Sequence, residues 1–430
     1  SMLDMLKAAG ANIVEFDEKA DIYIVNTCSV TNIADKKSRQ MLHRARKMNP
    51  DGIVIAAGCY VQSAREILEQ DEAIDIVISN NKKKSITEIV NDYINVRNNE
   101  KNAPGKDHEA MEYFVDISRE TEYEEMGGHV PVGHTRAYVK IQDGCNQFCS
   151  YCIIPYVRGR IRSRSQEAIL AEVSELAEAG IKEVVLTGIH ISSYGKDKNN
   201  EGALIELIEA ISKIKGIKRI RLGSLEPGII TEEFVERISS NSKVCPHFHL
   251  SLQSGCDSVL KRMNRKYTCE QYFEKCDMLR KAYKSPALTT DVIVGFPGET
   301  EEEFAETVRY LTELNLYEMH IFKYSPRKGT VAAAMKEQVA PEIKNERSDV
   351  LLKLAHDNKT AYEAQFEGCE LEVLVEEVVK KNNKTYLRGH TERYMDILID
   401  VGDISMPESF VNSFVYVTYT QNGGNLPLLL

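Results

Sequence analysis

Residues 137–152 read Ala-Tyr-Val-Lys-Ile-Gln-Asp-Gly-Cys-Asn-Gln-Phe-Cys-Ser-Tyr-Cys. The apolar run at 137–141 predicts a β-strand. Three cysteines then follow as a C-x3-C-x2-C array at Cys145, Cys149 and Cys152. Because only short loops separate the cysteines, their thiolates can converge on one soft metal centre. The stretch therefore predicts a metal-binding loop directly after a strand.

The number of cysteines in this loop bears on which metal it binds. A structural zinc site usually has four protein ligands, arranged as pairs of cysteines or histidines. No second cysteine pair follows, and neither His134 nor His190 stands at a customary zinc spacing. A cubane [4Fe-4S] cluster on three thiolates would leave one iron free for a substrate or cofactor, so the array favours a catalytic iron–sulfur site. Zinc binding and unligated, buried cysteines are the alternatives.

The bulk composition limits the class of protein. The chain has 430 residues, enough for two or three domains. It has no run of eighteen apolar residues and no basic-then-apolar signal at its start, so we expect no membrane segment. Ten cysteines without such a signal predict a reducing, cytoplasmic location. The net charge of −11 argues against a nonspecific nucleic-acid binder, so any RNA contact needs local basic patches.

The first hundred residues predict an open parallel α/β domain, which we assign to residues 1–100. Apolar runs at 22–25, 53–57 and 74–78 alternate with helical patterns. Cys28 and Cys59 each follow one of these strands and should share the carboxyl edge of the sheet, where open α/β sheets bind ligands. Taken alone, two cysteines at strand ends are more often core residues than ligands. The sequence opens in a helix where such a unit normally begins with a strand, so one strand, and with it a third cysteine at its end, is missing from the expected pattern.

A polar segment, residues 101–133, predicts a linker, and a second βα series follows over residues 134–366. The series predicts a partial (β/α)6 barrel, in which chemistry gathers at the carboxyl ends of the strands. The expected strands are 137–142, 183–187, 219–222, 247–252, 287–294 and 320–324. Glycines and polar residues recur where these strands end, and such positions let a backbone or a short side chain approach a ligand. The strand-end positions are Gly188, His190, Ser224, Glu226, Gln253, Gly255 and Gly295. Each turn also has a purely structural interpretation, such as the capping box of Thr300 and Glu303.

Beyond this series, residues 367–430 predict a small all-β barrel because short strands alternate with turn residues. Several basic residues and one tyrosine gather in one hairpin region of this barrel. Cations there could meet phosphates and the aromatic ring could stack on a base, although a charge run is usually a solvated face. These residues are Lys380, Lys381, Lys384, Arg388, Arg393 and Tyr394.

With these features in place, the sequence resembles the radical S-adenosylmethionine (SAM) methylthiotransferase family over nearly its whole length. The resemblance is carried by motifs that include the cysteine array, the arginine run after it and the strand-end turns. They are Cys145-Asn-Gln-Phe-Cys149-Ser-Tyr-Cys152-Ile-Ile-Pro155, Arg158-Gly-Arg160-Ile-Arg162-Ser-Arg164, Thr187-Gly188-Ile-His190, Gln253-Ser-Gly255, Asp291-Val-Ile-Val-Gly295-Phe-Pro-Gly-Glu299-Thr300 and Tyr324-Ser-Pro-Arg327-Lys-Gly329-Thr330. The last domain resembles the TRAM domain, an RNA-binding module.

The resemblance implies two [4Fe-4S] clusters and SAM as cofactors. One cluster on Cys145, Cys149 and Cys152 would chelate SAM through its open iron and cleave it to a 5′-deoxyadenosyl radical. An auxiliary cluster would use Cys28, Cys59 and a third cysteine on the missing strand, and would supply the sulfur. We expect that strand upstream of Ser1; the alternative is a form of the protein that cannot hold the second cluster normally. The resemblance also implies a nucleoside pocket near the radical cluster. Its residues would be Tyr151, Gly188, Ser224, Glu226, Gln253, Val292 and Gly295.

The resemblance further implies that the substrate is the anticodon stem-loop of a tRNA. We expect it to be held by the basic hairpin, by the arginine run Arg158, Arg160, Arg162 and Arg164, and by a basic helix at 36–47. The motifs look most like members that add a methylthio group to carbon 2 of N6-threonylcarbamoyladenosine at tRNA position 37. The alternatives are the isopentenyladenosine enzymes, a ribosomal-protein aspartate methylthiotransferase that usually has an acidic residue where this chain has Arg327, and a non-catalytic iron–sulfur RNA-binding or redox-sensing protein. We expect a monomer that takes electrons from a donor such as flavodoxin or ferredoxin.

Overall fold

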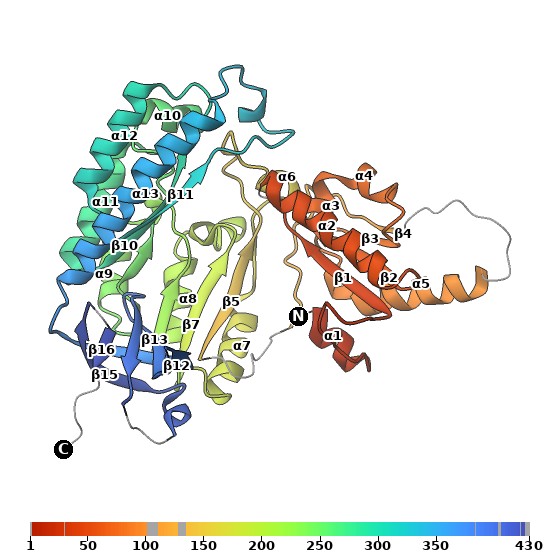
Figure 1. The fold of residues 1–430 in the computed structure, drawn as a ribbon, viewed down its shortest axis with the longest axis horizontal. Helices are drawn as coiled ribbons and strands as arrows, with labels where there is room; N and C mark the ends of the chain where they lie inside the picture. The colour runs from red at the N-terminus through yellow and green to blue at the C-terminus, as the bar shows by residue number, and fades with distance from the viewer. Residues whose placement is uncertain are drawn as a thin grey trace. The chain divides into compact units, whose positions relative to one another are not determined.

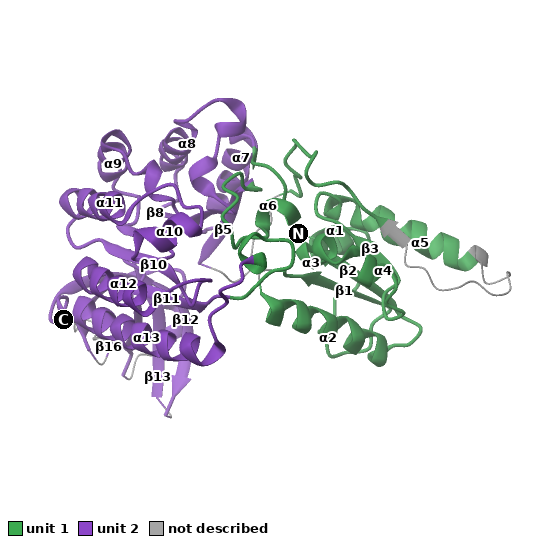
Figure 2. Ribbon diagram, turned by 90° about the horizontal axis from the view of Figure 1, so that it is seen from above, with its two compact units in different colours: residues 1–129, 143–164, 325–334 green, residues 130–142, 165–324, 335–430 purple. Residues whose placement is uncertain are grey.

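The computed structural model describes residues 2–29, 31–100, 111–127, 135–382, 384–402, 406–421 and 423–425. The chain divides into two compact units, coloured separately in Figure 2. Unit 1 comprises residues 1–129, 143–164 and 325–334, and unit 2 comprises residues 130–142, 165–324 and 335–430. Both units are discontinuous in sequence. The cysteine array therefore belongs to the same unit as the N-terminal residues.

Unit 1 is built on a parallel sheet whose order is β1-β2-β3-β4. Its strands are β1 (Ile22–Thr27), β2 (Ile53–Gly58), β3 (Ile76–Ile78) and β4 (Met111–Tyr113). Its helices are α1 (Met2–Ala8), α2 (Asn32–Met48), α3 (Cys59–Ser63), α4 (Arg65–Glu69), α5 (Ile86–Glu100) and α6 (Ile154–Val157), with β6 (Arg162–Ser163), η1 (Lys83–Ser85) and η5 (Ala332–Ala334) completing the unit.

Both faces of this sheet are buried under helices. Along β2, Val54 packs into one core with Leu42 of α2, while Ile55 packs into the other with Ile86 of α5. Successive residues of a strand point to opposite faces, so a strand buried on both sides reads as a continuous apolar run. The predicted open parallel α/β architecture is confirmed.

The edge strand β4 lies inside the segment that we expected to be a linker. Three residues, Met111–Tyr113, pair with β3 in parallel register. A strand of this length is too short to show a period-2 pattern, so the sequence gives no signal for it. Residues 101–110 and 128–134, which hold the two ends of that linker and His134, lie outside the described residues.

Unit 2 contains the predicted partial barrel. The strands β5 (Arg136–Asp143), β7 (Glu183–Gly188) and β8 (Arg219–Leu222) form one parallel group, and β9 (His247–His249), β10 (Ala287–Val294) and β11 (Glu318–Lys323) form another. The isolated parallel bridge between Leu225 and Leu250 links the groups just past β8 and β9. Over the described residues, the two groups thus follow each other in chain order as the two parts of an open, curved half barrel.

Helices cover one face of this curved sheet (Figure 1). They are α7 (Gln166–Glu178), α8 (Ala203–Ser212), α9 (Glu232–Ser239), α10 (Asp257–Arg262), α11 (Cys269–Ala282), α12 (Glu301–Leu314) and α13 (Pro341–Ala364), with η2 (Ile191–Ser193), η3 (Lys196–Lys198) and η4 (Pro227–Ile229) between them. Alternate strand residues such as Val139, Leu186 and Val292 pack into the core under these helices. The intervening residues therefore face the opposite, concave side. Among the described residues, no helix is both long and apolar enough to cross a membrane.

The C-terminal part of unit 2 is a closed barrel with the order β12-β13-β14-β16-β15. Its elements are β12 (Glu370–Lys381), β13 (Lys384–Thr391), β14 (Asp396–Asp400), β15 (Phe414–Thr420), β16 (Gly423–Asn425) and η6 (Pro407–Phe410). Val373, Leu387 and Ile399 are fully buried in its core. The predicted small all-β barrel is confirmed, and closure leaves it without a free sheet edge among the described strands.

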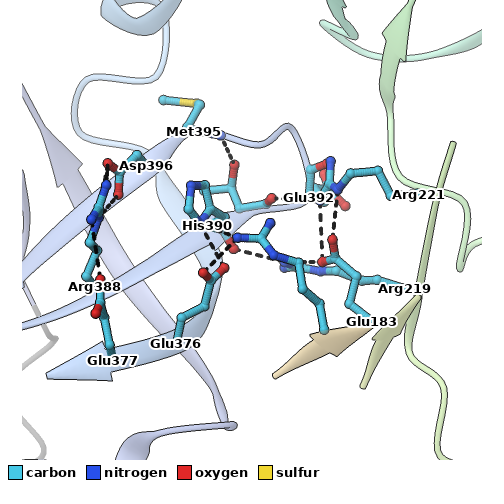
Figure 3. Close-up of polar contacts among 12 residues, drawn as sticks. Glu183, Arg219, Arg221, Glu376, Glu377, Arg388, His390, Glu392, Met395 and Asp396 are labelled. Atoms are coloured by element: carbon cyan, nitrogen blue, oxygen red, sulfur yellow. Dashed lines mark hydrogen bonds and ion pairs between the residues drawn. The ribbon is translucent and has the colours of Figure 1, made fainter. Parts of the chain in front are cut away.

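A buried polar cluster joins this small barrel to the amino ends of the half-barrel strands (Figure 3). Arg221 Nε donates to Glu183 Oε1 at 2.8 Å, and its Nη2 donates to the carbonyl of Thr391 in the small barrel at 3.3 Å. Arg219 donates to the carbonyls of His390 and Glu372, each at 3.0 Å. Burial alone would raise the pKa of the Glu183 carboxyl, but Arg221 outweighs burial and holds it below its ordinary value. The buried arginines Arg219 and Arg221 therefore have all these hydrogen-bond acceptors only when the small barrel is packed against the strands of the partial barrel.

Candidate functional site

The cysteine array starts directly after β5 and is shaped by a glycine. Gly144 has φ of +74°, and a Cβ there would lie 1.8 Å from the carbonyl oxygen of Arg160. No residue with a side chain fits at this position. Cys145 is buried, its N–H donates to the carbonyl of Gly159 at 3.0 Å, and its sulfur accepts the N–H of Gln147 at 3.4 Å. Cys149, Cys152 and Tyr151 are half-buried.

The arginine run after the array mostly points into unit 1. Arg162 has a fully buried side chain 3.9 Å from the carboxylate of Asp143, and burial lowers its pKa although Asp143 opposes the shift. Arg164 is buried and pairs with Glu125 at 2.6 Å. Arg160 is exposed and lies 4.6 Å from the ring centre of Phe148. Of the four arginines that we expected to contact tRNA, Arg160 has the exposure for that role.

Cys28 and Cys59 lie at one edge of the unit 1 sheet, as expected from the sequence. β1 and β2 are parallel neighbours and pair Thr27 with Gly58, so each cysteine comes one residue after a paired strand end. Gly58 has φ of +101°, and a Cβ there would lie 2.4 Å from the carbonyl oxygen of Thr27. The two strand ends can approach this closely only because residue 58 is glycine. Cys28 is exposed and Cys59 is buried.

Unit 1 also brings Cys59 next to the segment that follows the cysteine array. Arg158 Nε lies 3.0 Å from Cys59 Sγ, and its Nη1 lies 3.3 Å from Asp143. Cys59 packs with Ile153 and Val157 of the helix after the array. Burial disfavours the charge of Arg158, but Asp143 and Cys59 outweigh burial and raise its pKa. Both predicted cysteine sets therefore belong to one compact unit, and a guanidinium already faces one of the thiols.

Residues 325–334 attach to unit 1 through Arg327. This side chain is buried, and its Nη2 donates to Asp35 at 2.6 Å and to the hydroxyl of Ser29 at 3.0 Å. Its Nη1 donates to Asn32 at 2.7 Å. Further along, the N–H of Ala332 donates to the carbonyl of Ser150 inside the cysteine array at 2.8 Å. The segment thus touches both the residues after Cys28 and the array.

In unit 2, the predicted residues after β7 and β8 form a polar network. The N–H of His190 donates to Gln142 Oε1 at 2.8 Å, and its Nε2 lies 3.2 Å from Glu226 Oε2. A Cβ on Gly188 would lie 2.9 Å from the carbonyl oxygen of Gln142, so the turn needs glycine. Burial raises the pKa of the Glu226 carboxyl, but the contact with His190 outweighs burial and lowers it overall. Ser224 is exposed next to this network.

The predicted residues after β9 and along β10 differ in whether a side chain or only a backbone group could contact a ligand. Gln253 has φ of +76° and forms a parallel bridge with Val292. The Val292 side chain is fully buried in the helix-side core, so it can contact a ligand only through its backbone. Gly295 has φ of +68°, and its N–H donates to Glu299 Oε2 at 2.6 Å. Glu299 in turn pairs with Arg347 at 2.7 Å, which fixes this turn from α13.

Some residues of the basic hairpin in the small barrel are exposed, and others are paired with acidic residues of the barrel. Lys380, Lys381 and Lys384 are exposed, the last 3.8 Å from Asp400. Arg388 is half-buried and lies between Asp396 at 2.8 Å and Glu377 at 3.3 Å (Figure 3).

Two residues of the predicted RNA surface take part in packing. Arg393 donates to the carbonyls of Ser285 and Lys284, each at 2.9 Å. Tyr394 lies in the polar cluster. Its ring centre is 4.9 Å from the guanidinium carbon of Arg136 and 4.7 Å from that of Arg221. Its ring also stacks on His390 with centres 4.6 Å apart. These two side chains hold the small barrel on the half barrel.

Several residues that contact the candidate site were not predicted from the sequence. Asp143 and Asn80 contact the arginine and the thiol at the edge of unit 1, and Arg327 appeared only as a mark of substrate class. Asp143 stands directly before Gly144 and Cys145, and this position next to the cysteine array could have marked it as a site residue. No feature of the sequence marks Asn80, because its contact with the carbonyl of Val157 joins residues far apart in sequence.

Comparison with known proteins gives the family. Residues 139–311 match the Radical SAM superfamily, and residues 1–79 match the family described as Uncharacterized protein family UPF0004. A protein of Bacillus subtilis (strain 168), named threonylcarbamoyladenosine tRNA methylthiotransferase MtaB, is 39% identical over 395 residues, which cover 92% of this chain and 85% of that protein. The chain belongs to the radical SAM methylthiotransferases.

Other radical SAM methylthiotransferases match over similar lengths. The Aquifex aeolicus (strain VF5) protein with the same MtaB name is 37% identical, with 90% of this chain and 92% of that protein covered. A tRNA-2-methylthio-N(6)-dimethylallyladenosine synthase of Thermoanaerobacter pseudethanolicus is 36% identical, with 97% and 86% covered. Among solved structures, the radical SAM methyltransferase TsrM from Kitasatospora setae, with cobalamin and a [4Fe-4S] cluster bound, superposes with a TM-score of 0.56 at 16% identity over 74% of this chain and 66% of that one. That likeness concerns the fold alone.

Membership of the radical SAM methylthiotransferases implies a [4Fe-4S] cluster and SAM, and the array suits the cluster. Cys145, Cys149 and Cys152 supply three thiol ligands, and the N–H of Gln147 already donates to one of the sulfurs, as is common around cluster thiolates. At the edge of the unit 1 sheet, the described residues supply two thiols, Cys28 and Cys59. Their surroundings, with Arg158 donating to Cys59, suit a ligand thiolate, but a third ligand is needed.

Proposed function

We propose that this radical SAM methylthiotransferase modifies tRNA, adding a methylthio group to carbon 2 of N6-threonylcarbamoyladenosine at position 37, next to the anticodon. The observation that carries the proposal is the similarity, over most of the chain, to MtaB proteins of different bacteria at 35–39% identity, including the most identical relatives reported above. The relatives named as dimethylallyladenosine synthases, at 34–36% identity, make the isopentenyl-type substrate the second candidate.

We assign roles in this reaction to residues of the chain. Cys145, Cys149 and Cys152 hold the radical cluster, and a [4Fe-4S] cluster supplies the electron that cleaves the sulfonium of SAM. Tyr151, Gly188, Ser224, Glu226 and Gln253 bind and orient SAM, with Val292 and Gly295 contributing backbone groups. The His190 contact holds the Glu226 carboxylate ionised at neutral pH, so it can accept a hydrogen bond from a ribose hydroxyl. Cys28 and Cys59, with a third cysteine, hold the auxiliary cluster.

The contacts of Arg327 argue against a substrate of the ribosomal-protein aspartate type. In that group the corresponding residue is usually acidic. Here Arg327 is buried and donates to Asp35 at 2.6 Å, so an acidic residue would place two carboxylates side by side in a buried position. Such a pair is strongly unfavourable unless one carboxyl is protonated. The local structure of unit 1 is therefore built for arginine at this position.

Nucleoside analysis of total tRNA tests the substrate. In cells that lack this gene, we expect 2-methylthio-N6-threonylcarbamoyladenosine to disappear and its precursor to accumulate. Complementation with the wild-type chain should restore the product, whereas the Cys145→Ala variant should not. Loss of the methylthio-isopentenyl nucleoside instead would support the second candidate, and unchanged levels of both nucleosides would contradict a tRNA substrate in a cell without a redundant enzyme.

We propose that tRNA reaches the small barrel through the exposed lysines of its first hairpin. Replacing both Lys380 and Lys381 by glutamate should weaken tRNA binding and lower the slope of log affinity against log salt by about 1.4–1.8, because each phosphate contact contributes roughly 0.7–0.9. Arg388→Glu is the matched control: Asp396 and Glu377 already neutralise Arg388, so its effect should be smaller. Filter-binding titrations at several salt concentrations measure both. Equal affinity for the double variant and the wild type would remove the hairpin from the RNA surface.

We further propose that the chain acts as a cytoplasmic monomer and receives electrons from a flavodoxin- or ferredoxin-type protein. The proposed cluster ligands must be reduced cysteines, which agrees with a reducing compartment. We also propose that function divides as residues 1–100 for the auxiliary cluster, 134–366 for radical chemistry and 367–430 for RNA binding, with 101–133 as a connection.

A further inference from the structure

The concave side of the half barrel carries a group of side chains that the proposed function does not use. His249, Asp291 and His320 come from three neighbouring strands, β9, β10 and β11. Asp291 pairs directly with His320 in the β10–β11 register, and His249 pairs with Thr289, two residues before Asp291. The residues flanking them, such as Phe248 and Val292, pack in the helix-side core, so these three face the other side.

The potential ligand atoms of this group converge. One imidazole nitrogen of each histidine and one carboxylate oxygen of Asp291 all lie within 4.8 Å of one another. His249 Nε2 lies 3.4 Å from Asp291 Oδ2. Two ligands on a tetrahedral metal with bonds of 2.0–2.1 Å are about 3.4 Å apart, so this pair already has the spacing of a metal site. His320 is exposed, and its nearer ring nitrogen already lies within 4.8 Å of the other two ligand atoms.

The hydrogen bonding of His249 supports a cation at this point. Its Nδ1 lies 2.9 Å from the hydroxyl of Thr289, and its Nε2 is buried without a hydrogen-bond partner. If Nδ1–H donates to Thr289, then Nε2 presents a lone pair to the Asp291 carboxylate. Two acceptors facing each other in a partly buried site repel unless a proton or a cation lies between them. Fixing one ring nitrogen with a hydroxyl or carbonyl is also how proteins orient histidine ligands.

We propose that His249, Asp291 and His320 bind a divalent first-row transition-metal ion on the concave side of the half barrel. Two imidazoles and one carboxylate on one side of a metal leave its other positions open. Because His320 is exposed, those positions would be accessible to an oxygen or nitrogen ligand from outside the chain. None of these three residues is among the proposed cluster, SAM or tRNA ligands, and the inference does not depend on the proposed tRNA substrate.

Cobalt(II) titration of the full-length chain tests the site. The protein carries Cys145→Ala, Cys149→Ala and Cys152→Ala so that no cluster forms on the array. A site made of nitrogen and oxygen ligands gives weak visible d–d bands, whereas any cobalt held by Cys28 or Cys59 adds strong sulfur-to-cobalt charge transfer in the near ultraviolet. We expect one equivalent of cobalt with d–d bands and no charge transfer, displaced by zinc.

Substitutions assign the ligands. His249→Ala and the nearly isosteric Asp291→Asn should each lower cobalt affinity at least 100-fold, and Thr289→Val should lower it about 10-fold by releasing the orientation of His249. His356→Ala, an exposed histidine on α13, is the matched control and should change nothing. Circular dichroism checks that each variant is folded. Absence of the d–d bands, or equal affinity in a folded Asp291→Asn variant, would overturn the proposal and leave His249 as a protonated partner of Asp291.

Discussion

The Cys145→Ala variant is expected to form no 5′-deoxyadenosine from SAM after anaerobic reconstitution with iron and sulfide. Cys145 is buried, and its sulfur accepts the N–H of Gln147, so it is the most enclosed of the three array cysteines. An array with two thiols cannot hold a [4Fe-4S] cluster in the site-differentiated form that binds SAM. The expected effect is a loss of SAM cleavage to the background of the assay, by a factor of at least 10³.

The experiment needs readouts that separate loss of the cluster from loss of the fold. Iron content and the low-temperature electron paramagnetic resonance signal of the reduced protein should fall together with activity. Cys369→Ala is the matched control, because Cys369 is an exposed cysteine at the start of the small barrel and should leave all three readouts unchanged. Continued 5′-deoxyadenosine formation by Cys145→Ala, with Cys369→Ala also active, would refute the assignment of the array.

Replacing Glu183 by glutamine should cause the largest loss of stability of any single substitution in the polar cluster. Glu183 is almost fully buried and lies 2.8 Å from Arg221 and 3.9 Å from Arg219, both also buried. Removing its charge leaves two guanidinium groups without a buried counter-ion, and breaking a buried pair in this way typically costs about 3–5 kcal/mol. For a unit of this size, the thermal midpoint should fall by roughly 6–10 °C.

The matched control for this prediction is Glu377→Gln in the small barrel (Figure 3). Glu377 also pairs with an arginine, at 3.3 Å, but 53% of its side chain is exposed, and such pairs contribute about 0.2–1 kcal/mol. Differential scanning calorimetry compares the two variants. Equal midpoints would show that the buried cluster does not hold the two barrels together.

The pH dependence of the Glu183 contribution follows from its lowered pKa. In the unfolded chain a glutamate titrates near about 4.3, and in the folded protein Arg221 holds the pKa of Glu183 lower. The stabilisation by the ionised form is therefore complete above the unfolded pKa and is lost as the pH falls through the folded one. The difference between wild type and Glu183→Gln should be constant from pH 6 to 8 and should shrink in acid.

Local sequence patterns predicted most of the fold. The partial barrel followed from apolar strands at regular spacing, and the small barrel from short alternating strands, because both patterns reflect burial on one or two faces. The positions of Cys28 and Cys59 at one sheet edge followed from the same reasoning.

What the sequence could not give depends on contacts between distant residues. The arginine run looked like a basic surface, yet Arg162 and Arg164 are buried against Asp143 and Glu125. Tyr394 looked like a stacking platform for a base, yet its ring lies between Arg136 and Arg221. A sequence shows that a charge or an aromatic ring is present, but it does not show whether the partner of that group is a phosphate or a residue of another strand. The alignment of His249, Asp291 and His320 likewise depends on strand register, which no single strand reveals.

The contact of Arg327 with Asp35 has a consequence for the order of events during synthesis. Unit 1 includes residues 325–334, so a nascent chain that already contains Cys59 must wait for this distant segment before unit 1 is complete. At typical bacterial rates of about 5–20 residues per second, that wait is of the order of 10–50 s. During this interval Asp35 lacks its contact with Arg327. Limited proteolysis of ribosome-bound chains should therefore show more cleavage near Asp35 before residue 334 has left the exit tunnel than afterwards.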